Sequence, residues 1–405
     1  MGMAARAGRA IARASGPVTS LLLACACAGL HPPSTAPTPC WPRFPYQSGW
    51  LGADGAFSVP LSPTRSVWLF GDTFVGSPEQ TDRVGASFVH NSIGVSTCDG
   101  ERFDVRYVWG RAQDGAPRAF LERGDERWWW LFGGFVHGGR LYLGLLELEK
   151  SEPHGPLSLG FRSVGTALAR IDDPRAEPES WRPEILPLTR SAEAMPLSAL
   201  VIDGAHLFLF AFVDRGDGRS PRILLRLPLA RLEDGGDLGA ALETFGEDGT
   251  WLPGFAPSRA RILMDDDATE MSVRYHAEIR KWIALYNYPD ARGFPKTSPS
   301  DAIYARSADR LEGPWSPRRL VFRVPELASD RQPPADRNTG CYAAKEQPGF
   351  SLPGSLTFTY VCNLFAGTGE DPWGILQRLQ HRMDLYRPIA AAISVPAPTD
   401  GPEAR

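Results

Sequence analysis

The stretch WLGADGAFSVPLSPTRSVWLFGDTF, residues 50–74, predicts two β-strands joined by a tight turn. Residues 57–61 alternate between apolar and small or polar side chains, and residues 67–70 form a second apolar run of β-forming residues. A Ser-Pro-Thr sequence between them supplies the turn. Asp54 precedes the first strand and Asp72 follows the second. Antiparallel pairing therefore brings both carboxylates towards one edge of a small sheet.

The composition favours an all-β fold. The chain has 405 residues, of which 41 are Gly, 37 are Pro and 12 are Trp, a mixture typical of many tight connections and large rigid aromatic side chains. The net charge is −4, and no basic run is interleaved with aromatic residues. These features argue against a nucleic-acid partner.

The strand pattern of the opening stretch recurs along the chain. Units of several short strands occupy five segments: 50–109, 128–181, 197–229, 270–316 and 340–395. The connection 229–247 reads as helical or irregular. Such cycles predict a five-bladed β-propeller over residues 45–395, and a stack of β-sandwich domains is the alternative.

The first 28 residues read as an export signal, with a basic start, a short apolar run and small residues before the cleavage point. Cys25 ends a Leu-Leu-Ala-Cys sequence that resembles the lipobox of bacterial lipoproteins, and it is the predicted lipidation site. The alternative is cleavage after Ala28. Residues 29–44 read as a Pro/Ser/Thr-rich tether and residues 396–405 as a disordered tail. We expect an exported cell-envelope protein that contacts the membrane only through a lipid anchor, or otherwise a secreted one.

An exported protein meets an oxidising environment, in which the cysteines that follow the leader can form disulfides. Cys341 and Cys362 are nearly symmetric about a Ser-Leu-Pro-Gly turn, so a hairpin would place them opposite each other. Cys40 would then pair with Cys98. The alternative is four buried free thiols.

Nine short blocks, taken together and in order, carry a family resemblance. They are GADGAFSVPL (52–61), WLFGDTFVG (68–76), NSIGV (91–95), TEMSVRY (269–275), IALYN (283–287), IYARS (303–307), GPW (313–315), CYAAKEQP (341–348) and TYVCN (359–363). This set resembles the five-bladed β-propeller superfamily of glycoside hydrolases. It is most similar to a domain family, long of unknown function, that includes endo-D-arabinanases. The resemblance covers about residues 45–393.

The resemblance implies a set of catalytic carboxylates. Asp54 stands where the superfamily has a nucleophile or base, and Glu270 resembles the acid from a later blade. Asp72 resembles either the second catalytic carboxylate or a binding group. Glycoside cleavage needs one protonated carboxyl and one ionised carboxylate, and the working pair can be Asp54 with Asp72 or Asp54 with Glu270.

Five further residues are candidates for binding the substrate. Asn91, Arg274 and Tyr275 are placed as polar or charged groups facing the axial cleft, and Trp129 as a platform for stacking on a sugar ring. Glu346 is a further cleft candidate. The alternatives are packing between blades for Trp129 and an exposed strand charge for Arg274.

Other chemistries find little support. Residues 265–267 are three consecutive Asp, which we interpret as an exposed acidic turn and not as a calcium loop. The histidines are scattered, so we expect no metal site and no cofactor. Neither a phosphate-binding Gly loop nor a Gly-x-Ser-x-Gly elbow is present.

The sequence therefore predicts an exported, monomeric glycoside hydrolase. Its substrate would be a polysaccharide or oligosaccharide, furanoside-containing and arabinan-like, with the carboxylates in an axial cleft. The alternative is a non-catalytic propeller that binds a glycan or a surface protein.

Overall fold

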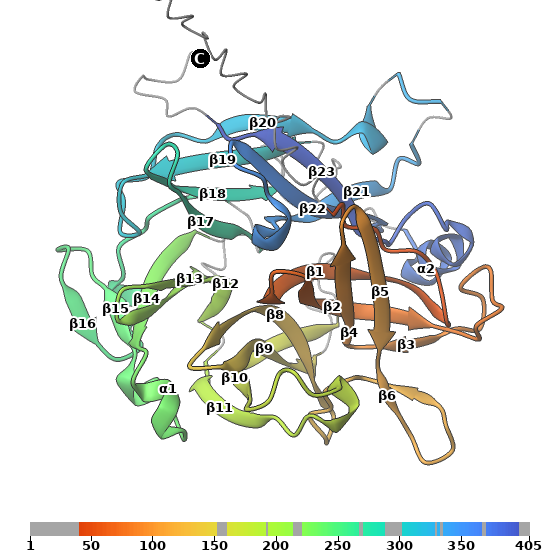
Figure 1. Cartoon of the computed structure of the whole chain (residues 1–405), viewed down its shortest axis with the longest axis horizontal. Coiled ribbons are helices and arrows are strands. Elements are labelled where there is room, and N and C mark those ends of the chain that lie inside the picture. Colours follow the sequence, from red (N-terminus) through yellow and green to blue (C-terminus); the bar gives the residue numbers. More distant parts are fainter. Residues whose placement is uncertain are drawn as a thin grey trace, which may run out of the picture. The chain divides into compact units, whose positions relative to one another are not determined.

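The computed structural model describes residues 40–151, 160–191, 193–213, 221–266, 270–287, 302–328, 330–332, 335–366 and 370–396. The predicted leader, Cys25, residues 29–39 of the tether and residues 397–405 of the tail lie outside the described residues. Strands dominate the described part, and they form five antiparallel sheets arranged around a centre (Figure 1).

Each sheet corresponds to one expected unit. The first contains β1 (Trp50–Ser62), β2 (Arg65–Val75), β4 (Ser92–Asp99) and β5 (Arg102–Val108), with β3 (Ser87–Val89) attached to β2. The second contains β8 (Arg127–His137), β9 (Arg140–Lys150), β10 (Phe161–Ile171) and β11 (Glu184–Thr189). The third contains β12 (Ala194–Asp203), β13 (His206–Val213), β14 (Arg222–Pro228), β15 (Glu243–Phe245) and β16 (Trp251–Pro253).

The fourth sheet contains β17 (Ser272–His276), β18 (Lys281–Asn287), β19 (Ala302–Ala308) and β20 (Arg319–Arg323). The fifth contains β21 (Thr339–Glu346), β22 (Ser355–Leu364) and β23 (Ile389–Ser394). A small hairpin pairs β6 (Gly110–Arg111) with β7 (Pro117–Arg118). The α-helices are α1 (Arg231–Asp234) and α2 (Pro372–His381); the 3₁₀ turns are η1 (Pro178–Ser180), η2 (Gly239–Ala241), η3 (Pro257–Arg259), η4 (Pro325–Leu327) and η5 (Pro348–Phe350).

The first strand of every sheet lies on the inside of the ring. β1 contacts β8, β8 contacts β12, β12 contacts β17, β17 contacts β21, and β21 returns to β1 (Figure 1). The predicted five-bladed β-propeller is therefore confirmed. Because the inner strands come from all five units, residues far apart in the sequence meet at the axis.

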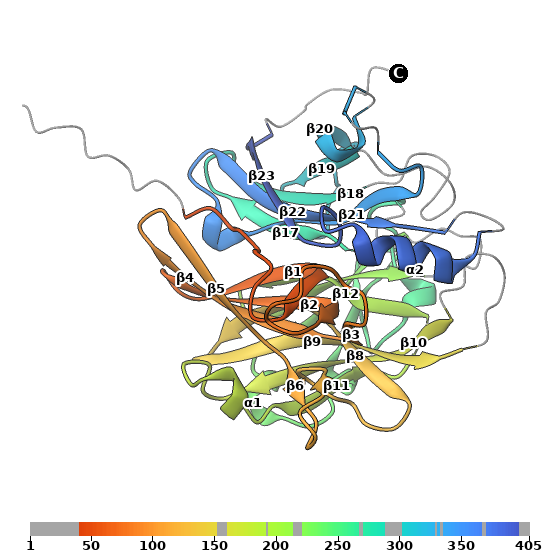
Figure 2. The same ribbon diagram turned by 90° about the vertical axis from the view of Figure 1, so that its right-hand side faces the viewer.

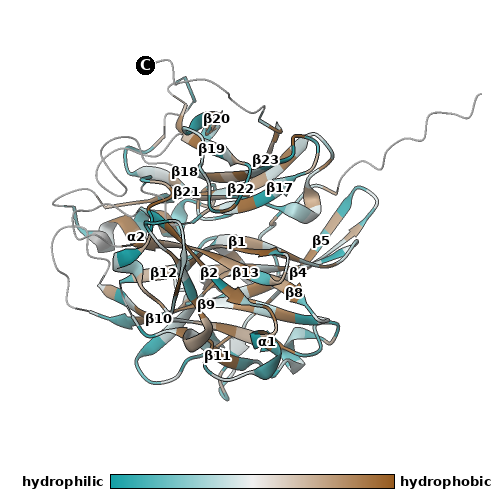
Figure 3. Cartoon of the chain, turned by 90° about the vertical axis from the view of Figure 1, so that its left-hand side faces the viewer, coloured by the Kyte–Doolittle hydropathy of each residue, from teal (hydrophilic) through white to brown (hydrophobic). Residues whose placement is uncertain are grey.

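Apolar side chains fill the space between neighbouring sheets, and hydrophobic colour follows the strands whereas the connecting loops are mostly hydrophilic (Figure 3). One cluster joins the N-terminal segment to the first sheet, and in it Phe44 packs edge-on against Trp68 at 4.8 Å between ring centroids. Phe44 is only 4% exposed. The packed chain thus includes residues that the sequence assigned to the tether.

One local interpretation holds in part and another was wrong. The connection 229–247 does contain α1 and η2, but it also supplies β15, because residues 243–245 pair with both β14 and β16. Asp266 is not in an exposed turn: it is 2% exposed and accepts hydrogen bonds from Arg306 at 2.7 Å and Arg318 at 3.1 Å. The paired guanidinium groups compensate the buried charge. Asp267 lies outside the described residues.

Hydrogen bonds from buried side chains join the fifth sheet to the first. Gln347, which is 1% exposed, donates to the carbonyl of Ala56 at 2.8 Å and accepts from the amide of Ser58 at 3.0 Å. A glutamine side chain thus pairs with the β1 backbone across the interface between the two sheets.

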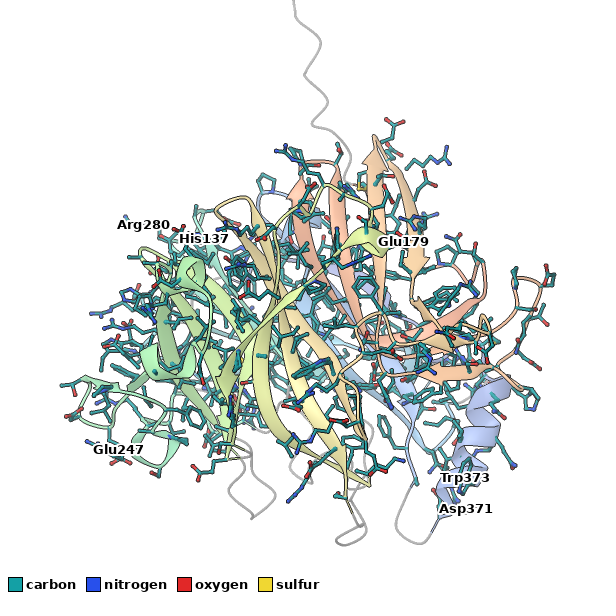
Figure 4. The ribbon with its side chains drawn as sticks, turned by 90° about the horizontal axis from the view of Figure 1, so that it is seen from below. His137, Glu179, Glu247, Arg280, Asp371 and Trp373 are labelled. Atoms are coloured by element: carbon teal, nitrogen blue, oxygen red, sulfur yellow. A yellow bond between two sulfur atoms is a disulfide. The ribbon has the colours of Figure 1, made fainter. Side chains whose placement is uncertain are left out.

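Helix α2 lies beside β22 on the flank of the fifth sheet (Figure 2). Asp371 caps its N-terminus by accepting from the amides of Trp373 and Gly374, both at 3.1 Å. Asp371 and Trp373 lie at the outer end of the helix (Figure 4), where Trp373 is 72% exposed.

Both expected disulfides are present. Cys341 and Cys362 are direct partners in the β21–β22 register, with Cα atoms 4.0 Å apart. Cys40 is bonded to Cys98 at the end of β4, which attaches the N-terminal segment to the first sheet. These four cysteines are therefore not free thiols.

Candidate active site

The start of β1 has an irregular backbone that places Asp54. Gly52 (φ 115°), Gly55 (φ 83°) and Ala56 (φ 64°) all adopt left-handed conformations, and the register with β2 shifts on both sides of Asp54. A side chain at Gly52 would lie 2.2 Å from the carbonyl oxygen of Tyr386. Bulges of this kind redirect individual side chains, and non-glycine residues with positive φ gather at functional sites.

Gly71 on β2 makes room for the Asp54 carboxyl group. A Cβ atom on Gly71 would lie 2.5 Å from Oδ1 of Asp54. The other oxygen, Oδ2, accepts a hydrogen bond of 2.8 Å from the hydroxyl of Tyr342 on β21. The adjacent Ala343 has a φ of 62°, at a point where the β21–β22 register shifts. Irregularities in two strands from opposite ends of the chain thus bring this pair together.

The three predicted acids lie near one another, because Ala53 pairs with Thr73 in the β1–β2 register, and Lys345 contacts both Glu270 and the carbonyl of Gly55. Burial raises the pKa of Asp54 from 3.8 to about 8, and the charges of Asp72 and Glu270 act in the same direction. The Tyr342 hydroxyl and the Lys345 ammonium group act in the opposite direction. The structure therefore gathers carboxyl groups from β1, from β2 and from Glu270, two residues before the start of β17.

Asp72 is held by the second sheet. Its Oδ1 accepts from the indole Nε1 of Trp130 at 2.9 Å and contacts Nδ1 of His90 at 3.1 Å. Its side chain is 17% exposed, so the group remains accessible to solvent. Within the described residues, neither a side chain nor a backbone amide hydrogen bonds to Oδ2 of Asp72. This oxygen is therefore available to a ligand or a water molecule.

Glu270 is paired with a buried lysine. Oε2 of Glu270 lies 2.7 Å from Nζ of Lys345, and the side-chain exposures are 13% and 1%. Lys345 comes from β21, three residues after Tyr342. A buried ammonium group next to a carboxylate compensates part of the negative charge of the cluster.

Aromatic rings lie beside Asp72. The imidazole of His90 stacks on Trp128 with 4.5 Å between centroids and 18° between planes. Phe161 packs edge-on against both Trp128 and Trp130. The side chain of His90 is 41% exposed. These rings form an aromatic wall next to the acids.

The tryptophans that lie beside Asp72 are Trp128 and Trp130, and not the predicted Trp129. Trp129 is 4% exposed and belongs to the core between the first three sheets, because alternation along β8 directs it away from Trp128 and Trp130. The expectation that Trp129 stacks on a sugar therefore disagrees with this geometry, and the alternative of packing between blades describes it.

Asn91 supports the backbone instead of facing solvent. It is fully buried, and its amide donates to the carbonyls of Leu121 and Trp129 at 3.0 and 2.9 Å. Its Oδ1 accepts from the amide of Leu121 at 2.8 Å. Asn91 thus fixes β8 against the first sheet and positions the neighbouring rings indirectly.

Glu346 and Arg274 form a separate ion cluster with His276. Oε1 of Glu346 accepts from Arg274 at 2.7 Å, and Oε2 lies 3.1 Å from Nε2 of His276. The Glu346 side chain is 1% exposed, so it is not open to a ligand. Burial alone would lower the pKa of His276, but the hydrogen bond and charge of Glu346 raise it overall. Tyr275 points the other way, is 43% exposed and packs against Trp282.

Sequence reasoning missed Tyr342, Lys345, His90 and Trp130. The alternation of the Trp run was a usable signal, since it separates Trp130 from Trp129. For Tyr342 and Lys345 no local signal exists, because their roles depend on a backbone irregularity in β21. Among the described residues, no group of His, Cys, Asp and Glu is arranged to hold a metal ion. In the same part of the chain no helix combines the length and apolar character needed to cross a bilayer.

Residues 44–393 match the model of a family described as a domain of unknown function, DUF5005. The chain belongs to this family. No curated protein matches the sequence.

Among solved structures, a protein from Bacteroides ovatus described as a candidate hydrolase has a TM-score of 0.63 and 16% identity, and the match covers 86% of this chain and 87% of that one. A GH43_1 enzyme from Xanthomonas citri has a TM-score of 0.42 and 13% identity, with coverages of 90% and 93%. The catalytic domain of a GH62 α-L-arabinofuranosidase from Coprinopsis cinerea has a TM-score of 0.42 and 11% identity, with coverages of 88% and 94%. At these identities the likeness concerns the fold, and membership among endo-D-arabinanases stays a prediction.

Proposed function

We propose that this DUF5005 protein is an exported glycoside hydrolase whose catalytic centre is the cluster of Asp54, Asp72 and Glu270. The observation that carries the proposal is that these acids converge from three elements while Asp54 retains its proton near neutral pH, with a pKa of about 8. A protonated carboxyl beside an ionised one is the requirement for cleaving a glycosidic bond.

The roles follow from the surroundings of each acid. Asp54 donates its proton to the departing glycosidic oxygen, and the C–O bond to the anomeric carbon breaks. Asp72, with Oδ2 available, provides the negative charge for the other half of the reaction: it either removes a proton from the attacking water or attacks the anomeric carbon itself. Glu270 is held by Lys345 at 2.7 Å, and its charge raises the pKa of Asp54. This assignment makes Asp54 the acid, whereas the resemblance implied a base or nucleophile at that position.

The substrate proposal rests on the motif resemblance and on the aromatic wall beside Asp72. His90, Trp128 and Trp130 offer ring faces and edges of the type that bind sugars. We propose a furanoside-containing, arabinan-like polysaccharide. The two disulfides support an oxidising, extracellular environment, in agreement with the leader read from the sequence.

The test is hydrolysis of arabinans, fructans and xylans by the purified full chain, followed by reducing-end release. We expect cleavage of at least one arabinan, with kcat/KM falling above about pH 8 as Asp54 loses its proton. Asp54→Asn and Asp72→Asn should each lower kcat/KM by about 10²- to 10⁴-fold. NMR of the first product anomer distinguishes attack by water from attack by Asp72.

Asp104→Asn is the matched control. Asp104 lies on β5 of the same sheet with its side chain 52% exposed and paired with Arg102. Its replacement should leave hydrolysis unchanged. The proposal fails if no polysaccharide is cleaved, or if Asp54→Asn cleaves as fast as the wild type.

A further inference from the structure

Lys345 is an almost fully buried cation with three oxygen atoms close to its ammonium group. Its side chain is 1% exposed, and Nζ donates to the carbonyl oxygens of Gly55 and Ala343, both at 2.7 Å. Nζ also forms an ion pair with Oε2 of Glu270 at 2.7 Å and lies 4.1 Å from the centre of the Phe57 ring. The ammonium group is therefore held by two backbone carbonyls and one carboxylate.

The two carbonyl groups belong to the irregular positions that place the acid cluster. Gly55 has a φ of 83° and directly follows Asp54, while Ala343 has a φ of 62° and directly follows Tyr342. A single ammonium group therefore connects the bend in β1, the bend in β21 and the carboxylate before β17. Left-handed residues persist only where the surroundings fix them.

Lys345 also offsets the negative charge of the cluster. The groups acting on Asp54 are the carboxylates of Asp72 and Glu270, the hydroxyl of Tyr342 and the Lys345 ammonium group. Tyr386 adds a second hydroxyl, which donates to the backbone carbonyl of Asp72 at 3.1 Å. Lys345 is in contact with Glu270 but not with Asp54. At Asp54 the charge of Lys345 therefore acts against the charges of Asp72 and Glu270.

We propose that Lys345 is a positioning residue of the acid cluster: it fixes Glu270 and the bends of β1 and β21, and its charge opposes that of Glu270 at Asp54. This inference rests on the proposed function, because Asp54 and Glu270 belong to the proposed catalytic centre. Lys345 touches neither the reacting bond nor Asp54, so it acts through Glu270 and the backbone.

The experiment compares Lys345→Met, Glu270→Gln and the double variant. Lys345→Met removes a charge that lowers the pKa of Asp54, so the alkaline limb of its kcat/KM should move to higher pH. Glu270→Gln removes a charge that raises this pKa, so its alkaline limb should move to lower pH.

The double variant provides the decisive comparison. It removes both charges, so its alkaline limb should lie between those of the two single variants. Lys345→Arg, which keeps the charge, should retain the wild-type limb. A wild-type limb in Lys345→Met, accompanied only by a lower Tm, would show a purely structural role and overturn the inference.

Carboxyl ¹³C NMR of the substrate-free protein gives a readout that does not depend on activity. The carboxyl signal of Asp54 should titrate at higher pH in Lys345→Met, and at lower pH in Glu270→Gln, than in the wild type. If the wild type cleaves no glycan, the proposed function fails while this titration still tests Lys345. If the wild type is active but the titration of Asp54 is unchanged in Lys345→Met, only the inference about Lys345 fails.

Discussion

The raised pKa of Asp54 suits an acid catalyst but lowers the stability of the folded state at higher pH. Burial and the charges of Asp72 and Glu270 raise the pKa of the Asp54 carboxyl group to about 8, although the hydrogen bond from Tyr342 acts in the opposite direction. In the unfolded chain the same group has its ordinary pKa of 3.8. The folded state thus binds the proton more tightly than the unfolded state, so this group favours folding at low pH and opposes it as the pH rises through 8.

Replacement by Asn removes this pH dependence. We expect Asp54→Asn to raise the free energy of unfolding, with a gain that grows from about pH 4 to about pH 8 and reaches about 1–3 kcal/mol there, below the full linkage value because of solvent screening. Urea denaturation at pH 5 and pH 8.5 measures the difference. Equal gains at both pH values would contradict the raised pKa.

At the scale of single elements, the disulfides lock strands that carry or flank the site. Cys341 precedes Tyr342 on β21 and is bonded across to Cys362 on β22. Cys40 holds the N-terminal segment against the first sheet through Cys98. Strand order around the site is therefore fixed covalently in the fifth sheet and at the outer side of the first.

Each disulfide should contribute according to the loop that it closes. With sequence separations of 21 and 58, loop closure gives about 3 kcal/mol for Cys341–Cys362 and about 4 kcal/mol for Cys40–Cys98. Double Cys→Ser variants, compared with the oxidised wild type by urea denaturation, measure both values. We expect Cys341→Ser with Cys362→Ser also to reduce kcat, because β21 carries Tyr342 and Lys345. An unchanged midpoint in either variant would argue against a structural bond.

At the scale of the whole propeller, the ring is closed by contacts between its last and first sheets. Arg83 is fully buried and donates to the carbonyls of Leu51 at 2.7 Å, Leu379 at 2.9 Å and Leu385 at 2.7 Å. It therefore joins β1 to the C-terminal end of α2 and the residues that follow it. Cations are favourable at helix C-termini, where carbonyl groups lack intrahelical partners.

Arg83→Met should lower the free energy of unfolding by about 4 kcal/mol, because it leaves buried carbonyl groups on both sides of the closure without a donor. Arg102→Met is the control, since Arg102 is 76% exposed and a surface ion pair is worth at most about 1 kcal/mol. Chemical denaturation compares the two variants. A loss no larger than that of the control would show that Arg83 does not close the ring.

The sequence by itself indicated the main strands, the five units, the pairing of the four cysteines and the proximity of Asp54 to Asp72. These features depend on alternation, turn residues and register within one sheet, which act over short distances along the chain. The sequence placed these two acids outside their strands, whereas they lie within β1 and β2, where Ala53 pairs with Thr73. Only the tertiary structure decided that Lys345 pairs with Glu270, that Tyr342 reaches Asp54 and that Asp266 is buried between arginines. Those contacts cross between sheets, and backbone irregularities in β1 and β21 set where the side chains point. The same reason explains the choice between Trp129 and Trp130. Only the packing of β8 in the propeller shows which of its faces meets the acids, and alternation along the sequence does not identify that face.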